Sequence, residues 1–326
     1  MQIGIIGLGR MGINMARRML KEGHEVFAYN RSIDKTELIS SEGAVGIYDI
    51  NDFKMKMKKP RSVIVMLPAG EIANKNIFTL SEVLESGDII IDGGNSNYED
   101  DIKRKEYLSD KGIKFMDAGI SGGVWGLENG YCLMIGGERT DYEYLKPVFL
   151  SLSSDNGNMY CGGTGAGHFV KMIHNGIEYA MMESYAEGFE LLRASKYGEN
   201  IDFSKLSELW NNGSVIKSWL LELIGEAFKE NPELDNIKGY VEDSGETRWM
   251  VKSAVDMGVS LPVISQSLFK RFDSRQDDLF SNKVLAAMRN KFGGHAMVRS
   301  EEEIKYNKNA GAGIVKPAKA DGNGNI

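Results

Sequence analysis

The sequence predicts an α/β domain with a parallel sheet followed by an all-α domain, and three observations carry this prediction. From Met1 to about Gly163, short β-branched apolar runs alternate with longer segments of helical period, the pattern of a parallel sheet covered by helices. The strand signal stops after a glycine-rich stretch at residues 161–167. The length of 326 residues suits two domains, each large enough to bury its own core.

Six strands are expected in the first domain, residues 1–163. Each is a short run rich in apolar residues and bounded by turn-forming residues. The segments between them have the period of helices. In chain order the strands are Gln2–Ile6, Glu25–Tyr29, Ser62–Leu67, Asp88–Ile91, Lys114–Met116 and Leu133–Ile135.

The second domain, residues 164–300, is predicted to consist of helices interrupted at Asn212-Gly213, Pro232 and Pro262. One long helix, buried at the centre of this domain, is expected over His168–Lys196, because apolar residues recur there at helical spacing without a break. Residues 301–326 lack apolar periodicity and are expected to form a disordered tail.

Composition argues against several classes of protein. The net charge of -7 counts against nucleic-acid binding, because neutralising phosphates requires an excess of Lys and Arg. Cys132 and Cys161 fall outside metal-ligand or CxxC spacing, so both are expected to be structural. The chain begins with a strand-like segment, and no apolar stretch approaches the roughly 20 residues that span a bilayer. We therefore expect a soluble, cytoplasmic protein that makes no membrane contact.

A glycine-rich motif indicates what the first domain binds. Gly7-Leu8-Gly9-Arg10-Met11-Gly12 directly follows the first expected strand and opens a helix, which is the context of a dinucleotide-binding fingerprint. Its glycines allow a tight turn, close approach of a pyrophosphate, and close packing of helix on strand, while the helix N-terminus offers N–H groups to phosphates. We expect a Rossmann-type NAD(P)-binding domain; a glycine turn without a ligand is the less favoured alternative.

The end of the second expected strand bears on the choice between NADP and NAD. NAD-binding domains place Asp or Glu there for the ribose 2′-hydroxyl, whereas this sequence has Asn30-Arg31-Ser32. Arg31 offers charged donors to a 2′-phosphate that a carboxylate would repel. NADP is therefore favoured and NAD is possible, with a solvated surface role for Arg31 as the alternative.

Two further loops follow expected strands at their carboxyl ends, where ligands of open α/β sheets bind. One contains Met66-Leu67-Pro68 and the other contains Gly93-Gly94-Asn95-Ser96. Both loops are expected to line the nicotinamide side of the cofactor site.

Two groups of polar residues indicate a substrate site. In Ser121-Gly122-Gly123, backbone N–H groups can approach an anion such as a carboxylate. Five polar residues at helical spacing share one face of the long apolar helix. Burying their Lys and Glu is costly unless a cleft uses them as base and acid, although a solvated face with an ion pair is the alternative. The five are Lys171, His174, Asn175, Glu178 and Tyr179.

No metal is expected, because no second His or carboxylate stands at metal-ligand spacing to His174.

Six motifs resemble, in order, those of the 6-phosphogluconate dehydrogenase family, over residues 1 to about 298. The KxxHNGIEY segment and the closing RxxFGGH are the most diagnostic, because 3-hydroxyisobutyrate dehydrogenase and tartronate semialdehyde reductase share only the fingerprint, the SGG turn and the lysine. The length matches the short form of the family. The motifs are Gly7–Gly12, Asn30–Ser32, Gly93–Ser96, Gly119–Gly123, Lys171–Tyr179 and Arg289–His295.

This resemblance implies oxidative decarboxylation of 6-phosphogluconate to ribulose 5-phosphate and CO2, with reduction of NADP or NAD. Lys171 would be the base and Glu178 the acid, with His174 and Asn175 beside them in the catalytic group. The implied substrate-binding residues are Asn95, Ser121, Gly122, Gly123 and Tyr179, with Arg248, Arg271 and Arg289 for the phosphate.

Departures and alternatives qualify the resemblance. The family usually has Gly where Thr247 stands and Thr where Met250 stands, which bears on the phosphate contact of Arg248. In the family a neighbouring subunit donates the RxxFGxH segment, which implies that Arg289 and His295 complete a partner's site in a homodimer or homotetramer. The alternatives are a non-decarboxylating β-hydroxyacid dehydrogenase and a non-catalytic cofactor-binding module on the same scaffold.

Overall fold

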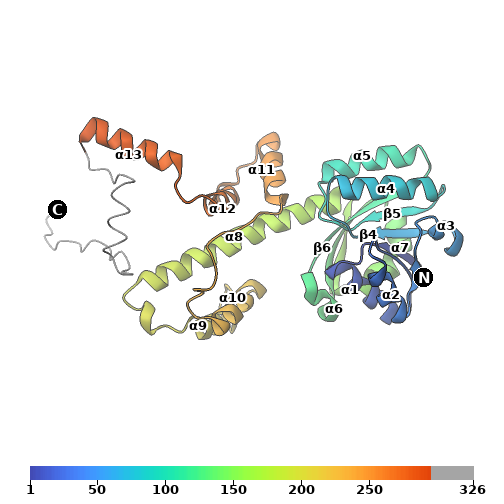
Figure 1. Ribbon diagram of the computed structural model, residues 1–326, viewed down its shortest axis with the longest axis horizontal. Helices are drawn as coiled ribbons and strands as arrows, with labels where there is room; N and C mark the ends of the chain where they lie inside the picture. The colour runs from blue at the N-terminus through green and yellow to red at the C-terminus, as the bar shows by residue number, and fades with distance from the viewer. Residues whose placement is uncertain (295–326) are drawn as a thin grey trace. The chain divides into compact units, whose positions relative to one another are not determined.

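The structure, a computed structural model, describes residues 1–294 (Figure 1). The chain divides into two compact units, Met1–Arg271 and a shorter unit that begins at Phe272. The predicted tail at residues 301–326 lies outside the described residues. No helix within residues 1–294 is long and apolar enough to cross a membrane.

An eight-stranded sheet forms the core of the first unit, in the order β3-β2-β1-β4-β5-β6-β7-β8. Neighbours from β3 to β6 are parallel, and their order is that of a dinucleotide-binding sheet. The predicted fold class, a Rossmann-type domain followed by helices, is therefore confirmed. The strands are β1 Gln2–Ile6, β2 Glu25–Tyr29, β3 Val45–Ile47, β4 Ser62–Val65, β5 Ile89–Asp92, β6 Lys114–Ser121, β7 Tyr131–Gly136 and β8 Ser153–Gly162.

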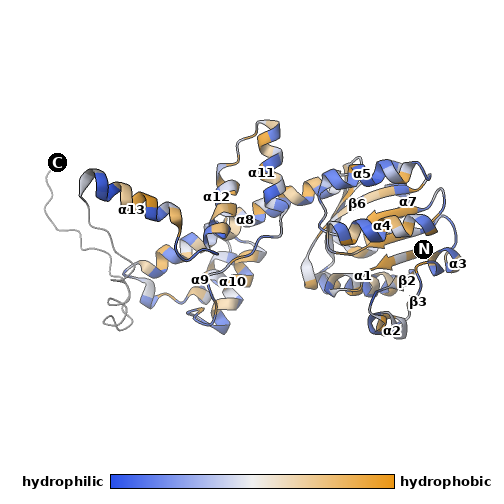
Figure 2. Ribbon diagram, turned by 45° about the horizontal axis from the view of Figure 1, so that its top comes forward, coloured by the Kyte–Doolittle hydropathy of each residue, from blue (hydrophilic) through white to orange (hydrophobic). Residues whose placement is uncertain are grey.

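Helices cover both faces of the sheet, and each face has its own apolar core (Figure 1). Successive side chains of a strand point to opposite faces, so Ile5 lies in the core under α1, α2 and α7, and Ile6 in the core under α3, α4 and α5. Burial on both faces explains why the central strands are mostly apolar (Figure 2). These helices are α1 Arg10–Lys21, α2 Ile33–Ser41, α3 Asp52–Lys56, α4 Glu71–Val83, α5 Tyr98–Ser109 and α7 Arg139–Leu152.

The strand prediction was incomplete in two respects. All six predicted strands are present, but β3 and β8 were missed, because β3 has only three residues and β8 is a largely polar edge strand. A wholly parallel sheet was also wrong, since β7 pairs antiparallel with β6 and β8 pairs parallel with β7. The segment between β6 and β7, residues 122–130, holds only η1 Gly123–Trp125 and α6 Gly126–Asn129. Such a short connection suits an antiparallel neighbour rather than a parallel crossover.

Helix α8, Ala166–Ala194, is the predicted long helix and carries the polar face. Its first half packs against β6, β7 and α11, and its second half joins an aromatic cluster around Phe189 and Phe228. The expected burial at the centre was wrong for much of the helix, since Ile177 is 48% and Met181 38% exposed in the chain. The remaining elements are η2 Gly198–Asn200, α9 Phe203–Asn211, α10 Trp219–Glu230, α11 Glu246–Met257, α12 Pro262–Asp273 and α13 Phe280–Gly293.

The predicted domain division at residue 163 stays a prediction. Strand β8 ends at Gly162 and α8 begins at Ala166, but both belong to one compact unit because α8 packs on the sheet.

Candidate functional site

The turn between β1 and α1 has the shape that a pyrophosphate requires. Gly7 has φ +97°, and a Cβ there would lie 2.4 Å from the backbone oxygen of Met66. A Cβ on Gly12 would lie 2.0 Å from the oxygen of Gly7, whereas one on Gly9 would meet nothing within 4 Å. The N-terminus of α1 at Gly9 has no side-chain cap. Two glycines thus allow close packing and the third leaves room for phosphate at a helix N-terminus, so the turn fits a dinucleotide.

Asn30 joins this turn to the end of β2. Its Oδ1 accepts a hydrogen bond from the Leu8 amide at 2.9 Å, and its Nδ2 donates to the Ser32 carbonyl at 3.1 Å. The Leu8 side chain is 1% exposed and packs in the core, while its amide donates to Asn30. Arg31 is exposed beside this junction. Asn30 therefore holds the two loops together, and Arg31 has the accessible cationic group.

The loops after β4 and β5 pack against each other at the same edge of the sheet. A Cβ on Gly93 would lie 2.6 Å from Met66 Sδ, and one on Gly94 would lie 2.6 Å from the Leu67 oxygen. Met66 also borders Gly7 and Gly12, so the loops after β1, β4 and β5 form one continuous rim. Met11 is only partly exposed, since it packs against the core. The exposed predicted cofactor residues on these loops and at the end of β2 are Gly9, Arg10, Arg31, Ser32, Pro68 and Asn95.

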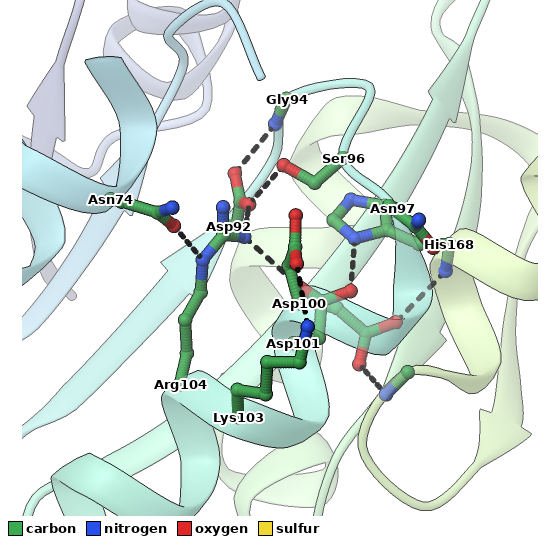
Figure 3. Close-up of polar contacts among 12 residues, drawn as sticks. Asn74, Asp92, Gly94, Ser96, Asn97, Asp100, Asp101, Lys103, Arg104 and His168 are labelled. Atoms are coloured by element: carbon green, nitrogen blue, oxygen red, sulfur yellow. Dashed lines mark hydrogen bonds and ion pairs between the residues drawn. The ribbon is translucent and has the colours of Figure 1, made fainter. Parts of the chain in front are cut away.

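A buried network of charges supports the loop after β5 (Figure 3). Asp92 accepts hydrogen bonds from Ser96 Oγ at 2.5 Å, from the Gly94 amide at 3.0 Å and from Arg104 Nη1 at 2.5 Å. The same Arg104 nitrogen lies 3.0 Å from Asp101 Oδ1. Asp92 bonds to Gly94 and Ser96, the two neighbours of Asn95. The network therefore fixes the conformation of the loop that carries Asn95, a predicted binding residue for substrate and cofactor.

The network continues into the first turn of α8. His168 Nδ1 lies 2.6 Å from Asp101 Oδ2, and Asp117 accepts from the His168 amide at 2.9 Å. Burial raises the pKa of Asp101 to about 6, against the opposing effect of His168. Burial acts to lower the pKa of His168, but Asp101 and its neighbours outweigh it and raise the value to about 9. Each partner thus favours the charged form of the other, and their contact ties α5 to α8 one turn before Lys171.

Three residues of this network have the spacing of a metal site, but the Arg104 guanidinium binds its carboxylates. Ligand atoms of Asp92, Asp101 and His168 all lie within 4.8 Å of one another. Arg104 Nη1 is bonded to both carboxylates, at 2.5 Å and 3.0 Å, so a guanidinium supplies the positive charge there. The sequence did not reveal this cluster, because His168 lies 67 residues from Asp101.

The polar face of α8 meets the end of β6. Lys171 is 6% exposed, and its Nζ donates to Asn175 Oδ1 at 2.8 Å and lies 3.5 Å from His174 Nδ1. His174 Nε2 lies 3.4 Å from Ser121 Oγ. A Cβ on Gly119 would lie 2.4 Å from Lys171 Cβ, so glycine there lets the helix approach the strand. The structure thus brings four predicted site residues into one cluster.

Burial makes Lys171 easier to deprotonate than an exposed lysine. Burial lowers the pKa of Lys171, and the charges of Glu178 and Glu246 oppose that effect only in part. Glu178 Oε2 lies 3.8 Å from His174 Nδ1, and its side chain is 39% exposed. A buried amine with a lowered pKa and a nearby solvent-accessible carboxyl are the groups that a base and an acid require.

Glu246 is a member of the cluster that the sequence reasoning missed. It is 2% exposed and accepts a hydrogen bond from Asn175 Nδ2 at 3.1 Å. Because 71 residues separate the two, no local spacing could indicate the contact. The only available signal was its place in the segment that also contains Arg248.

The predicted phosphate ligands of the first unit have partners of their own. Arg271 stacks on the ring of Tyr179, with 3.5 Å between Cζ and the ring centroid. The Tyr179 hydroxyl accepts from the Ser244 amide at 3.0 Å. Arg248 makes a two-bond pair with Asp243, at 2.7 Å and 2.8 Å. A phosphate at Arg248 would therefore compete with the Asp243 carboxylate, which already pairs with this guanidinium.

The two departures from the family pattern lie in the packing of α11. Thr247 is fully buried, and Met250 is 4% exposed. A Cβ on Gly176 would lie 2.3 Å from Met250 Sδ, so the glycine of α8 accommodates this methionine. Met250 thus belongs to the contact between α8 and α11, and Thr247 is buried rather than part of an open binding surface.

The remaining predicted substrate-binding residues lie in the turn after β6, in the second unit and outside the described residues. Gly122 and Gly123 form the turn after β6, with φ +125° and +54°. Arg289 is an exposed residue of α13 in the second unit. His295 lies outside the described residues.

Known sequence families match both parts of the chain. The NAD-binding domain of 6-phosphogluconate dehydrogenase matches residues 2–163, and the C-terminal domain of that enzyme matches residues 167–279. The Bacillus subtilis protein YqeC is 43% identical over 296 residues, covering 91% of this chain and 99% of its own. The NAD(+)-dependent, decarboxylating 6-phosphogluconate dehydrogenase of Haloferax volcanii is 39% identical over 304 residues, covering 93% and 100%.

Solved structures agree with these matches. The 6-phosphogluconate dehydrogenase of Plasmodium falciparum has a TM-score of 0.77 and 27% identity, covering 94% of this chain and 68% of its own. A 3-hydroxyisobutyrate dehydrogenase from Salmonella typhimurium has a TM-score of 0.68 at 20% identity, covering 82% and 91%, which shows a shared fold. From both the sequence matches and the site on α8, the chain belongs to the 6-phosphogluconate dehydrogenase family, with that family's NAD-binding domain at its N-terminus.

Proposed function

We propose that the chain catalyses oxidative decarboxylation of 6-phosphogluconate to ribulose 5-phosphate and CO2, with NADP or NAD as the oxidant. The observation that carries this proposal is the buried Lys171, held by Asn175 and His174 beside Ser121. The names of the relatives support the same substrate and reaction. No metal takes part in this proposal.

In the proposed reaction the bound nicotinamide accepts the hydride that leaves C3 of the substrate. Neutral Lys171 takes the proton of the 3-hydroxyl as the 3-keto acid forms. CO2 then leaves, and its bonding electrons pass into an enediolate whose oxygen the protonated Lys171 stabilises. Glu178 finally protonates the carbon that becomes C1 of ribulose 5-phosphate, which gives the product. Lys171 and Glu178, both on α8, thus supply the groups that accept and donate the protons of this reaction.

The test is an assay of 6-phosphogluconate oxidation with each cofactor, in which reduced nicotinamide and released CO2 are both measured. Equal amounts of the two products are expected. Reduced cofactor without CO2 would instead indicate the non-decarboxylating alternative. Cofactor binding without turnover on the sugar acid would indicate a binding module.

We propose NADP as the preferred cofactor, because the exposed residue at the end of β2 is Arg31 rather than a carboxylate. Relatives include both NAD(+)- and NADP(+)-dependent enzymes. Arg31→Asp is expected to lower the ratio of kcat/KM for NADP over NAD by about tenfold to a hundredfold. A hydrogen bond to a charged group contributes about 1.5–3 kcal/mol, which corresponds to that range.

The matched control for Arg31 is Lys75→Asp, the same reversal of charge at an exposed position of α4. It should leave the cofactor ratio unchanged. An unaltered ratio in Arg31→Asp would mean that Arg31 is a solvated surface residue.

We further propose that Arg289 and His295 complete the active site of a neighbouring subunit in a homodimer or homotetramer. The family resemblance of the RxxFGGH segment supports this arrangement. Lys171→Met and His295→Ala should each be nearly inactive, but co-assembled subunits should recover activity. Random mixing in a dimer places an intact Lys171 and an intact His295 together in about a quarter of the sites.

The control for subunit mixing combines Lys171→Met with a chain that carries both substitutions, since no site can then be intact. If co-assembled single variants stay as inactive as this control, with mixing verified by mass spectrometry, the segment acts on its own chain.

A further inference from the structure

We propose that Glu246 is a positioning residue, whose buried carboxylate orients the amide of Asn175 and thereby holds the amino group of Lys171. This inference rests on the proposed function, in which Lys171 is the base. Three groups form the chain of contacts. Lys171 Nζ donates to Asn175 Oδ1 at 2.8 Å, and Asn175 Nδ2 donates to Glu246 Oε1 at 3.1 Å.

A carboxylate at this position determines which way the Asn175 amide faces. An ionised carboxylate only accepts hydrogen bonds, so the amide must turn its Nδ2 to Glu246 and its Oδ1 to Lys171. A neutral amide in place of Glu246 could either accept or donate, and both orientations of Asn175 would then be possible. The charge of Glu246 thus acts together with Lys171 and His174, which both contact Asn175 Oδ1, to specify the orientation of the amide.

Glu246 lies at the N-terminus of a helix and is shielded from solvent. Glu246 is the first residue of α11, where the positive end of the helix dipole stabilises an anion. The side chain is 2% exposed, and its Oε2 has no hydrogen-bond partner among residues 1–294. Little solvent therefore screens this charge from Lys171.

Charged and titratable groups face Lys171 from three elements. They are His174 and Glu178 on α8, Cys132 on β7 and Glu246 on α11. Burial lowers the pKa of Lys171, and Glu178, Glu246 and Cys132 raise it. Glu178 is 39% exposed, so solvent screens its charge more than that of Glu246.

Glu246→Gln conserves the shape of the side chain and removes its charge. Without that charge Lys171 loses a proton more easily, so the acidic limb of the kcat/KM profile should move to lower pH. The expected shift is roughly 0.5 to 1 pH unit, below the 1–3 units typical of charges in direct contact, because Asn175 stands between the groups. A role in folding alone would not move this limb.

Glu246→Asp tests the hydrogen bond to Asn175 separately from the negative charge. The shorter side chain keeps a buried carboxylate but draws it away from Asn175. We expect kcat to fall by about tenfold, as one charged hydrogen bond is lost, while KM for the cofactor and the acidic limb stay near wild type. The matched control for Glu246→Gln is Asp256→Asn, which removes one exposed charge from the same helix. It should change neither kcat nor the acidic limb of the kcat/KM profile.

A second measurement makes the result independent of turnover. Competitive acetylation with acetic anhydride across pH, followed by mass spectrometry, gives the midpoint for deprotonation of Lys171 itself. The midpoint should be lower in Glu246→Gln than in wild type and unchanged in Asp256→Asn. If wild type does not oxidise 6-phosphogluconate, the proposed function fails, but this titration still decides the role of Glu246.

The labelling midpoint and the acidic limb together decide the role of Glu246. A downward shift of both the labelling midpoint and the acidic limb in Glu246→Gln alone supports the proposal. An unchanged labelling midpoint overturns it, and so does an equal shift in Asp256→Asn, which would reflect the net charge of the protein. Circular dichroism of each variant establishes that a folded protein is compared.

Discussion

Replacement of Lys171 by methionine is expected to lower kcat by about 10²- to 10⁴-fold, the range that a general base contributes. Methionine keeps much of the apolar stem but cannot accept the hydroxyl proton. The loops that fit the dinucleotide lie after β1, β4 and β5, so the Kd for the reduced cofactor should stay within about twofold of wild type. Steady-state kinetics and fluorescence titration with reduced cofactor measure the two effects.

Lys196→Met serves as the control for this substitution, because Lys196 is an exposed lysine just beyond the end of α8. It should retain wild-type turnover. If Lys171→Met kept turnover within a few-fold of wild type, another group would have to be the base.

Arg104→Leu is expected to destabilise the protein by about 3–5 kcal/mol, because it leaves buried carboxylates without their compensating charge. Arg104 is 1% exposed, and both Asp92 and Asp101 are fully buried around it. Urea denaturation gives the free energy of unfolding. The loop after β5 also depends on this network (Figure 3), so the KM for substrate and cofactor should rise in the variant.

The pH dependence of this loss has a definite sign. The pKa of Asp101 is already raised by burial to about 6, and removal of Arg104 raises it further. Protonation of Asp101 in the folded variant then relieves the unpaired charge at low pH. The difference in unfolding free energy between wild type and Arg104→Leu should therefore be larger at about pH 8 than at about pH 5.

Lys103→Leu is the matched control on the same helix, since its side chain is 73% exposed and faces Asp100 at 3.5 Å. It should change the unfolding free energy by less than about 0.5 kcal/mol. An equally small change in Arg104→Leu would show that the buried pairs contribute little to stability.

The sequence alone determined the dinucleotide-binding fold and the polar face of α8. Both are local patterns: Gly7, Gly9 and Gly12 stand at fixed offsets after a strand, and Lys171, His174 and Asn175 share a face through the helical repeat. The short strand β3 and the polar strand β8 escaped prediction because an edge strand is held by backbone pairing and needs no apolar run.

Only the tertiary structure decided which distant groups control these residues. Glu246 contacts Asn175 across 71 residues, and His168 contacts Asp101 across 67 residues. The sequence likewise could not show that Arg248 is paired with Asp243. Such contacts form when α8 packs on the sheet and on α11, and the burial of their charges, which sets pKa and hydrogen-bond direction, exists only in the packed chain.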